Sequence, residues 1–178
     1  MNKIALIVAA SAAIFSSASF AQGYVGGALA RTALDLDCDG TVSCEESATG
    51  FKLFGGYAFG NGFAVEGSYI SFGTQNVRAL NSVDFKAHSF GIGAAYRYNF
   101  TPKWQAAARL GLARNTFKTS DVAGTESESK IQPTFGIGGS YKVLPKLSID
   151  ASLDFTRFKF DGETRAASLL GVGATFSF

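Results

Sequence analysis

The last ten residues, Leu169-Leu-Gly-Val-Gly-Ala-Thr-Phe-Ser-Phe178, decide the fold. From Leu170 every second residue is apolar, and the residues between them are small and mostly polar. A period of two is typical of a β-strand whose two faces meet different surroundings. A strand of a soluble sandwich normally carries charge on its solvent face, but this one carries none. The pattern therefore favours a strand of a membrane barrel.

The same period recurs along the rest of the chain, and in almost every segment its phase can be read from the sequence. The expected strands lie near residues 24–31, 51–59, 63–69, 90–100, 104–112, 134–143, 147–155 and 169–178. Only the first has a phase that its residues do not settle. Eight is an even number, and most segments approach the length that a tilted strand needs to cross a bilayer. We therefore predict an all-β fold, an eight-stranded antiparallel up-and-down transmembrane β-barrel.

The connections between these segments alternate in length. Asn61-Gly62 predicts a type I′ hairpin, and Thr101-Pro-Lys103 and Leu144-Pro-Lys146 predict two further tight turns. Longer polar connections are expected at 32–49, 73–82, 119–129 and 161–164. This alternation places all turns at one end and all loops at the other, as in barrels with periplasmic turns and extracellular loops. Aromatic residues gather beside the turns as a predicted interfacial girdle: Phe59, Phe63, Tyr98, Phe100, Trp104, Tyr141, Phe176 and Phe178.

The N-terminal segment predicts export. Residues 1–21 combine Lys3, a short apolar run and small residues before Ala21, which indicates a cleaved signal peptide. Residues 22–178 then form the barrel domain, and they contain no apolar run long enough for a transmembrane helix. Composition agrees with strands, since 47% of residues are hydrophobic, 17% are charged and 21 are glycine. The net charge of +2 without a basic block argues against nucleic-acid binding.

Charged residues on the predicted inner faces form a candidate network: Lys52, Glu66, Arg97, Arg109, Lys142, Asp150 and Asp154. The lumen of an eight-stranded barrel is only wide enough to be filled by side chains, and buried charges must pair. The network is therefore expected to plug the lumen. The alternative is a narrow ion path that opens when the charges change partners.

Several segments resemble the eight-stranded outer-membrane proteins related to the transmembrane domain of OmpA and to opacity-type surface proteins. They are Phe54-Gly-Gly-Tyr-Ala-Phe59, Phe63-Ala-Val-Glu-Gly-Ser-Tyr69, Gly93-Ala-Ala-Tyr-Arg-Tyr-Asn-Phe100 and Ala108-Arg-Leu-Gly-Leu-Ala113, with the terminal Phe178. The resemblance implies a multi-pass barrel in a Gram-negative outer membrane, surrounded by its lipids. It implies that the assembly machinery reads Phe176 and Phe178, and that Glu66 pairs with Arg97 and Arg109.

The longest predicted loop carries an acidic motif. Carboxylates and one backbone carbonyl follow the spacing of an EF-hand loop at Asp35, Asp37, Asp39, Thr41 and Glu46, which suits Ca²⁺. Flanking helices are absent. Cys38 and Cys44 lie inside the motif and are expected to form a disulfide in an oxidising compartment. The alternative is an acidic, solvated loop closed by that disulfide, with no metal and no cofactor.

An enzymatic function finds little support. His88 is the only histidine, and the neighbouring Ser89 points to the opposite face of a strand, so the two cannot act as base and nucleophile. We therefore expect a monomeric, non-enzymatic barrel that contributes to envelope integrity and presents its loops to an external surface partner. The alternatives are a narrow channel for small solutes, a calcium-binding loop protein, and a lipid-modifying enzyme.

Overall fold

The computed structural model is all-β, as predicted, and describes residues 22–34, 43–44, 47–78, 82–121, 124–160 and 163–178. The strands are β1 (Gln22–Leu34), β2 (Ser43–Cys44), β3 (Ser47–Ala58), β4 (Phe63–Arg78), β5 (Ser82–Asn99), β6 (Trp104–Asp121), β7 (Gly124–Leu144), β8 (Leu147–Phe160) and β9 (Glu163–Ser177). The predicted signal peptide, residues 1–21, lies outside the described residues. No helix in the described part of the chain is long and apolar enough to cross a membrane.

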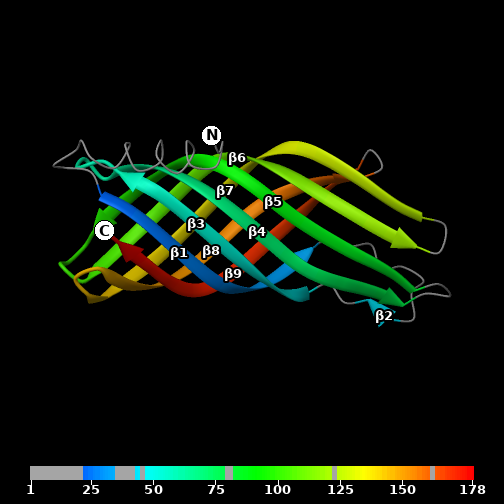
Figure 1. Ribbon diagram of the computed structural model, residues 1–178, viewed down its shortest axis with the longest axis horizontal. Helices are drawn as coiled ribbons and strands as arrows, with labels where there is room; N and C mark the ends of the chain where they lie inside the picture. The colour runs from blue at the N-terminus through cyan, green and yellow to red at the C-terminus, as the bar shows by residue number, and fades with distance from the viewer. Residues whose placement is uncertain (1–21, 35–42, 45–46, 79–81, 122–123, 161–162) are drawn as a thin grey trace, which may run out of the picture.

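The eight long strands close into a barrel. Each pairs antiparallel with its neighbour in sequence, β1 pairs with β9, and β4 pairs with β5. The two-residue β2 is an addition to this ring, because it pairs only with the far end of β4. The strands wind steeply around the long axis, and the chain ends beside the start of β1 (Figure 1). Closure removes the unpaired edges that a bilayer would not tolerate.

The two faces of the strands follow the predicted alternation. Leu170 and Val172 of β9 are about 60% exposed on the outer face, whereas Leu169 on the inner face is 1% exposed. The phase of β1, left open by its sequence, is now clear, because Val25 and Leu29 point outward and Tyr24 points inward. An apolar outer surface with a mixed interior is the arrangement that lipid requires.

The three short connections share one end of the barrel. The first is a hairpin as predicted, but the type I′ turn is wrong. The amide of Gly62 donates to the carbonyl of Phe59, so Gly60 and Asn61 are the central residues, and Gly62 follows at φ 89°. This is a three-residue connection whose last residue is left-handed, a position that glycine occupies without strain. The other two turns, around Pro102 and Pro145, are short as predicted.

Two of the four predicted long loops are wrong. The strands run on through most of residues 73–82 and 119–129, so that β7 alone has 21 residues. At 161–164, strand β9 already begins at Glu163, and residues 161–162 lie outside the described part of the chain. Most residues of these segments are polar or small, and the alternation that marks a strand in the bilayer is lost there. Backbone pairing continues without it. The connection between β1 and β3 remains long, and it contains β2.

One pair of strands separates before the barrel ends. β7 pairs with β8 only from Leu144 and Leu147 up to Phe135 and Phe155. Beyond that level β7 stays paired with β6 as far as Gly124, and β8 stays paired with β9 as far as Phe160. The described parts of β7 and β8 therefore leave an open seam, and the β6–β7 hairpin extends past the end of β8 (Figure 1).

Candidate functional site in the barrel interior

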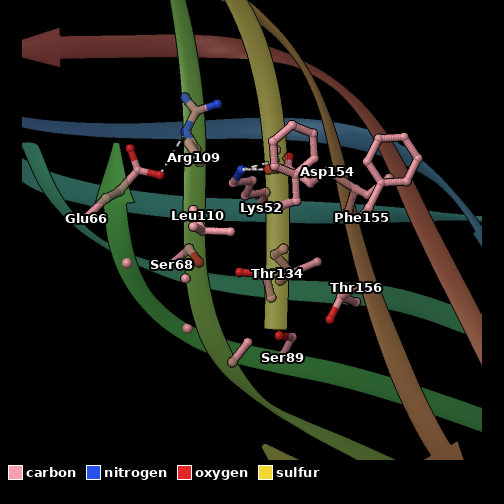
Figure 2. A pocket seen from close by; sticks show the side chains of 18 of the residues that line it. Lys52, Glu66, Ser68, Ser89, Arg109, Leu110, Thr134, Asp154, Phe155 and Thr156 are labelled. Carbon is pink, nitrogen blue, oxygen red and sulfur yellow. Dashed lines mark hydrogen bonds and ion pairs between the residues drawn. The ribbon is translucent and has the colours of Figure 1, made fainter. Parts of the chain in front are cut away.

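The interior holds a buried ion pair between opposite walls. Lys52 of β3 is 2% exposed, and its Nζ donates to both carboxylate oxygens of Asp154 of β8 at 2.7 and 2.8 Å. The hydroxyl of Ser152 also donates to that carboxylate. A buried ammonium is tolerated only with such partners, because desolvation of a lone charge costs several kcal/mol. Figure 2 shows the two side chains meeting across the lumen.

A second cluster joins β1, β4 and β6. One carboxylate oxygen of Glu66 lies 3.0 Å from Nε of Arg109, and the other accepts a 2.9 Å hydrogen bond from the hydroxyl of Tyr24. The contact with Arg109 is an ion pair rather than a hydrogen bond, because the N–H is not aligned with the carboxylate. The buried carboxylate of Glu66 is thus stabilised by the positive charge of Arg109 and by the hydroxyl donor of Tyr24.

Arg97 enters this cluster through an aromatic ring. Its guanidinium carbon lies 3.7 Å from the centre of the Tyr24 ring, a cation–π contact, and no described ion pair joins Arg97 to Glu66. Tyr24 therefore links two charged residues, a role that the sequence did not predict because the phase of the first strand could not be read from it. The signal that could have found it is the small or polar character of every second residue from Gly26 to Thr32.

The two remaining predicted network residues lie elsewhere. The carboxylate of Asp150 accepts a 2.6 Å hydrogen bond from the hydroxyl of Thr175, and no described cation forms an ion pair with it. Lys142 lies at the mouth beside the short turns, where it is exposed. The structure thus brings five of the seven residues into two adjacent clusters and leaves Lys142 and Asp150 at the end of the lumen.

Two apolar clusters also fill the interior. The first, near the short turns, contains Tyr24, Phe54, Ala64 and Ala95. The second, toward the other end, contains Ala30, Ile70, Phe72, Ala87, Ala167 and Leu169. The ring of Phe54 lies next to both charged clusters, since its centre is 5.5 Å from Nζ of Lys52 and 5.6 Å from Cζ of Arg109. Ile70, Phe72 and Ala87 of the second cluster were not predicted, because the alternation read from the sequence ended at Tyr69 and resumed at Phe90.

Two small cavities lie in the described lumen, one on each side of the Tyr24–Phe54 cluster. One, of about 50 Å³, lies beside the Lys52–Asp154 pair and reaches Ser89 and Thr156 (Figure 2). The other, of about 70 Å³, opens among polar residues at the short turns. Each can hold a few water molecules. They share no lining residue, and the Tyr24–Phe54 cluster lies between them.

A hydrogen-bonded bridge spans the foot of the open seam. The side-chain amide of Asn115 on β6 donates to the hydroxyl of Thr156 at 2.8 Å and to the carbonyl of Arg157 at 2.6 Å, both on β8. Arg157 lies just beyond the last β7–β8 pair, where β7 supplies no backbone donor. Asn115 therefore satisfies from the inside a carbonyl that the neighbouring strand leaves free.

The predicted calcium loop and disulfide stay predictions. Asp35, Asp37, Asp39, Thr41 and Glu46, with Cys38, lie outside the described residues, and Cys44 is described only as part of β2. Within the described ranges, no group of three or more His, Cys, Asp or Glu residues is placed to hold a metal ion.

His88 and Ser89 occupy opposite faces of β5, as the alternation predicts. The His88 ring lies 6.4 Å from the ring of Tyr69 on the outside, whereas Ser89 is buried in the interior. A base and a nucleophile on opposite sides of the wall cannot exchange a proton. This pair therefore does not form a hydrolytic site.

Aromatic rings form contacts around the short-turn end. Phe63 packs on Tyr96, Tyr98 on Phe100, and Trp104 on Tyr141, with ring centres 4.9 to 5.0 Å apart. These rings are partly to largely exposed on the outer surface. Exposed aromatic rings at one level are typical of the interface between lipid and water.

A closed barrel of eight antiparallel strands, apolar outside and filled by side chains inside, defines the class of small membrane-spanning β-barrels. Comparison with protein families agrees, since the model of the outer membrane protein beta-barrel domain matches residues 4–178. The chain belongs to this family. No curated protein sequence matches it.

Several solved structures of outer-membrane proteins have the same fold. Neisserial surface protein A (NspA) has 20% identity and a TM-score of 0.66, covering 92% of this chain and 100% of that one. Ail, the attachment invasion locus protein of Yersinia pestis, has 26% identity and a TM-score of 0.53, covering 88% and 97%. OprG of Pseudomonas aeruginosa has 12% identity and a TM-score of 0.63, covering 89% and 96%. These likenesses support an outer-membrane location.

Proposed function

We propose that this protein is a non-enzymatic outer-membrane scaffold, which stabilises the envelope and presents its long strand ends to an external partner. The observation that carries the proposal is the division of the lumen. Two cavities of about 50 and 70 Å³ share no lining residue, and an apolar cluster lies between them. A barrel filled in this way has the rigidity of a packed core and no room for a solute.

The ends of the strands support an orientation across the membrane. A tilted strand needs about 9 to 11 residues to cross the hydrocarbon, whereas β5, β6 and β7 have 18, 18 and 21. The short turns mark one end of these strands, so the excess length projects from the other. Outer-membrane barrels keep short turns on the periplasmic side. The projecting end is therefore proposed to be extracellular.

The likeness to Ail supports a surface role for that end. Ail is named for attachment and invasion, and it has also been solved in complex with the heparin analogue sucrose octasulfate. The protein in that complex has 26% sequence identity to this chain, and its structure has a TM-score of 0.52. By analogy, the projecting strands and the connection between β1 and β3 are the surface that we propose for an external partner.

Two measurements test the scaffold. A deletion strain is expected to show higher permeability to detergents and dyes, or weaker adhesion, and complementation with the intact gene restores the wild-type value. Folded protein, verified by a heat-modifiable band on gels, is expected to leave a planar lipid bilayer silent. Reproducible conductance steps from that same preparation would instead support the narrow-channel alternative and refute a closed lumen.

A further inference from the structure

We propose that the polar vestibule at the short-turn mouth binds an oxyanion with the chemistry of a phosphate group. The vestibule is the cavity of about 70 Å³ described above, and positive side chains line it from two strands and two turns. Arg97 comes from β5, Lys142 from β7, and Lys103 and Lys146 from the two turns beside them. This binding site is separate from the proposed scaffold role, which requires only the closed layers deeper in the lumen.

The charges in the vestibule do not balance. Four cationic side chains line it, whereas Asp150 is the one carboxylate among its described lining residues. That carboxylate is already hydrogen bonded to Thr175. Within the described part of the chain, Lys103, Lys142 and Lys146 form no ion pair. Like charges gathered at a concave, low-dielectric wall create a positive potential, which attracts an anion.

Arg97 gives the vestibule a fixed donor at its inner end. The guanidinium is stacked on Tyr24, and its buried Nε has no hydrogen-bond partner. A planar guanidinium held by an aromatic ring presents its remaining N–H groups in a defined direction, and this geometry suits an oxyanion. The lysines at the rim are flexible and add charge rather than geometry.

Neutral polar groups complete the wall. Gln105 donates from Nε2 to the side-chain oxygen of Asn99 at 2.9 Å, and the hydroxyl of Ser140 is 3.5 Å from the other end of the same amide. This chain of side chains crosses from β5 through β6 to β7 at the level of the vestibule. It makes this part of the wall polar, whereas an apolar wall would exclude a hydrated anion.

The position of Lys142 indicates how the anion arrives. Lys142 shares the inward phase of Gly138 and Ser140, so it extends from the lumen face of β7 and not from the lipid face. A soluble phosphate can reach it from the aqueous side. The headgroup of an anionic lipid offers the same phosphate chemistry from the edge of the mouth, and the experiment separates these two sources.

The test uses the full mature chain folded in zwitterionic detergent micelles. Inorganic phosphate is titrated at constant ionic strength and followed by calorimetry, with the wild type compared to Lys142→Gln, Lys146→Gln and the double variant. Arg114→Gln is the matched control, because it removes one positive charge from the exposed outer face of β6, away from the mouth. The lysines are exposed, so the variants are expected to fold, and heat-modifiable gel migration verifies this.

We expect each lysine substitution to weaken phosphate binding about fivefold, the upper range for a partly exposed charge pair, and Arg114→Gln to leave it unchanged. A second titration uses nanodiscs of phosphatidylcholine with and without phosphatidylglycerol. If the natural anion is soluble, phosphatidylglycerol leaves phosphate binding unchanged. If a lipid headgroup occupies the site, phosphatidylglycerol weakens phosphate binding by the wild type and not by the lysine variants. Both results support the vestibule. No measurable binding by the wild type, or equal weakening by all single variants including Arg114→Gln, would overturn the proposal.

Discussion

Removal of the ammonium group from Lys52, as in Lys52→Met, should destabilise the barrel strongly. Lys52 is 2% exposed and the Asp154 side chain opposite it is 14% exposed, with two hydrogen bonds of 2.7 and 2.8 Å between them. After the substitution, the Asp154 carboxylate keeps only the donor of Ser152. Breaking a buried pair from one side typically costs about 3 to 5 kcal/mol, because the remaining charge stays desolvated. Even the lower figure changes the unfolding equilibrium roughly a hundredfold.

The measurement is equilibrium unfolding in urea of protein folded in lipid vesicles, followed by the fluorescence of Trp104. Trp104 is the only tryptophan, and it lies on the outer face at the short turns, where its emission reports transfer from lipid to water. Lys142→Met is the matched control, since that lysine is exposed at the mouth, and it should change stability by less than about 0.5 kcal/mol. Lys52→Met/Asp154→Leu should recover most of the loss, because an apolar pair replaces an ionic one.

Two results would refute this reasoning. If Lys52→Met unfolds at the urea concentration of the wild type, the pair does not hold the lumen closed. If the double variant is no more stable than Lys52→Met, the loss comes from side-chain packing and not from an unpaired charge.

Three further predictions concern the packing, the seam and the first turn. Phe72→Ala should cost about 3 kcal/mol in urea unfolding, because it empties part of the second apolar cluster, whereas Phe72→Leu should cost less than half of that. Asn115→Ala should cost about 1 to 3 kcal/mol and speed hydrogen exchange at the seam end of β8; unchanged exchange there would contradict the bridge. Gly62→Ala should destabilise the first hairpin by about 1 kcal/mol or more, since φ is 89° and a Cβ would lie 2.9 Å from the carbonyl of Arg97, whereas Gly60→Ala should be nearly neutral.

The sequence was most informative where the bilayer constrains both faces of a strand. In β9 the apolar and small residues alternate without exception from Leu170, because one face meets lipid and the other meets a crowded lumen. Beyond the hydrocarbon that constraint ends. The segment of β7 from Gly124 to Lys130 is polar on both faces, so its sequence resembles a loop although its backbone is paired with β6.

The sequence predicts which charged residues point into the lumen, but it does not predict which of them contact one another. Inward phase identified Lys52, Glu66, Arg109 and Asp154 from alternation alone. Which of them meet depends on the stagger of the strands around the barrel, and alternation carries no information on stagger. Tyr24 shows the consequence. Its hydroxyl donates to one oxygen of Glu66 and its ring stacks on the guanidinium of Arg97, yet it lies on a strand whose phase could not be read from the sequence.

The seam between β7 and β8 sets a limit on the thickness of membrane that this protein can span. Peptide groups beyond Phe135 and Phe155 lack a backbone partner on the neighbouring strand. Described side chains donate to the carbonyls of Pro133 and Arg157, and water must supply the remaining hydrogen bonds. The paired length of β8 against β7 runs from Leu147 to Phe155, about the length that a tilted strand needs to cross the hydrocarbon. A thicker bilayer would cover unpaired peptide groups, at a cost of several kcal/mol for each. The paired length at this seam therefore leaves little reserve, and a thicker bilayer would meet its mismatch cost first between β7 and β8.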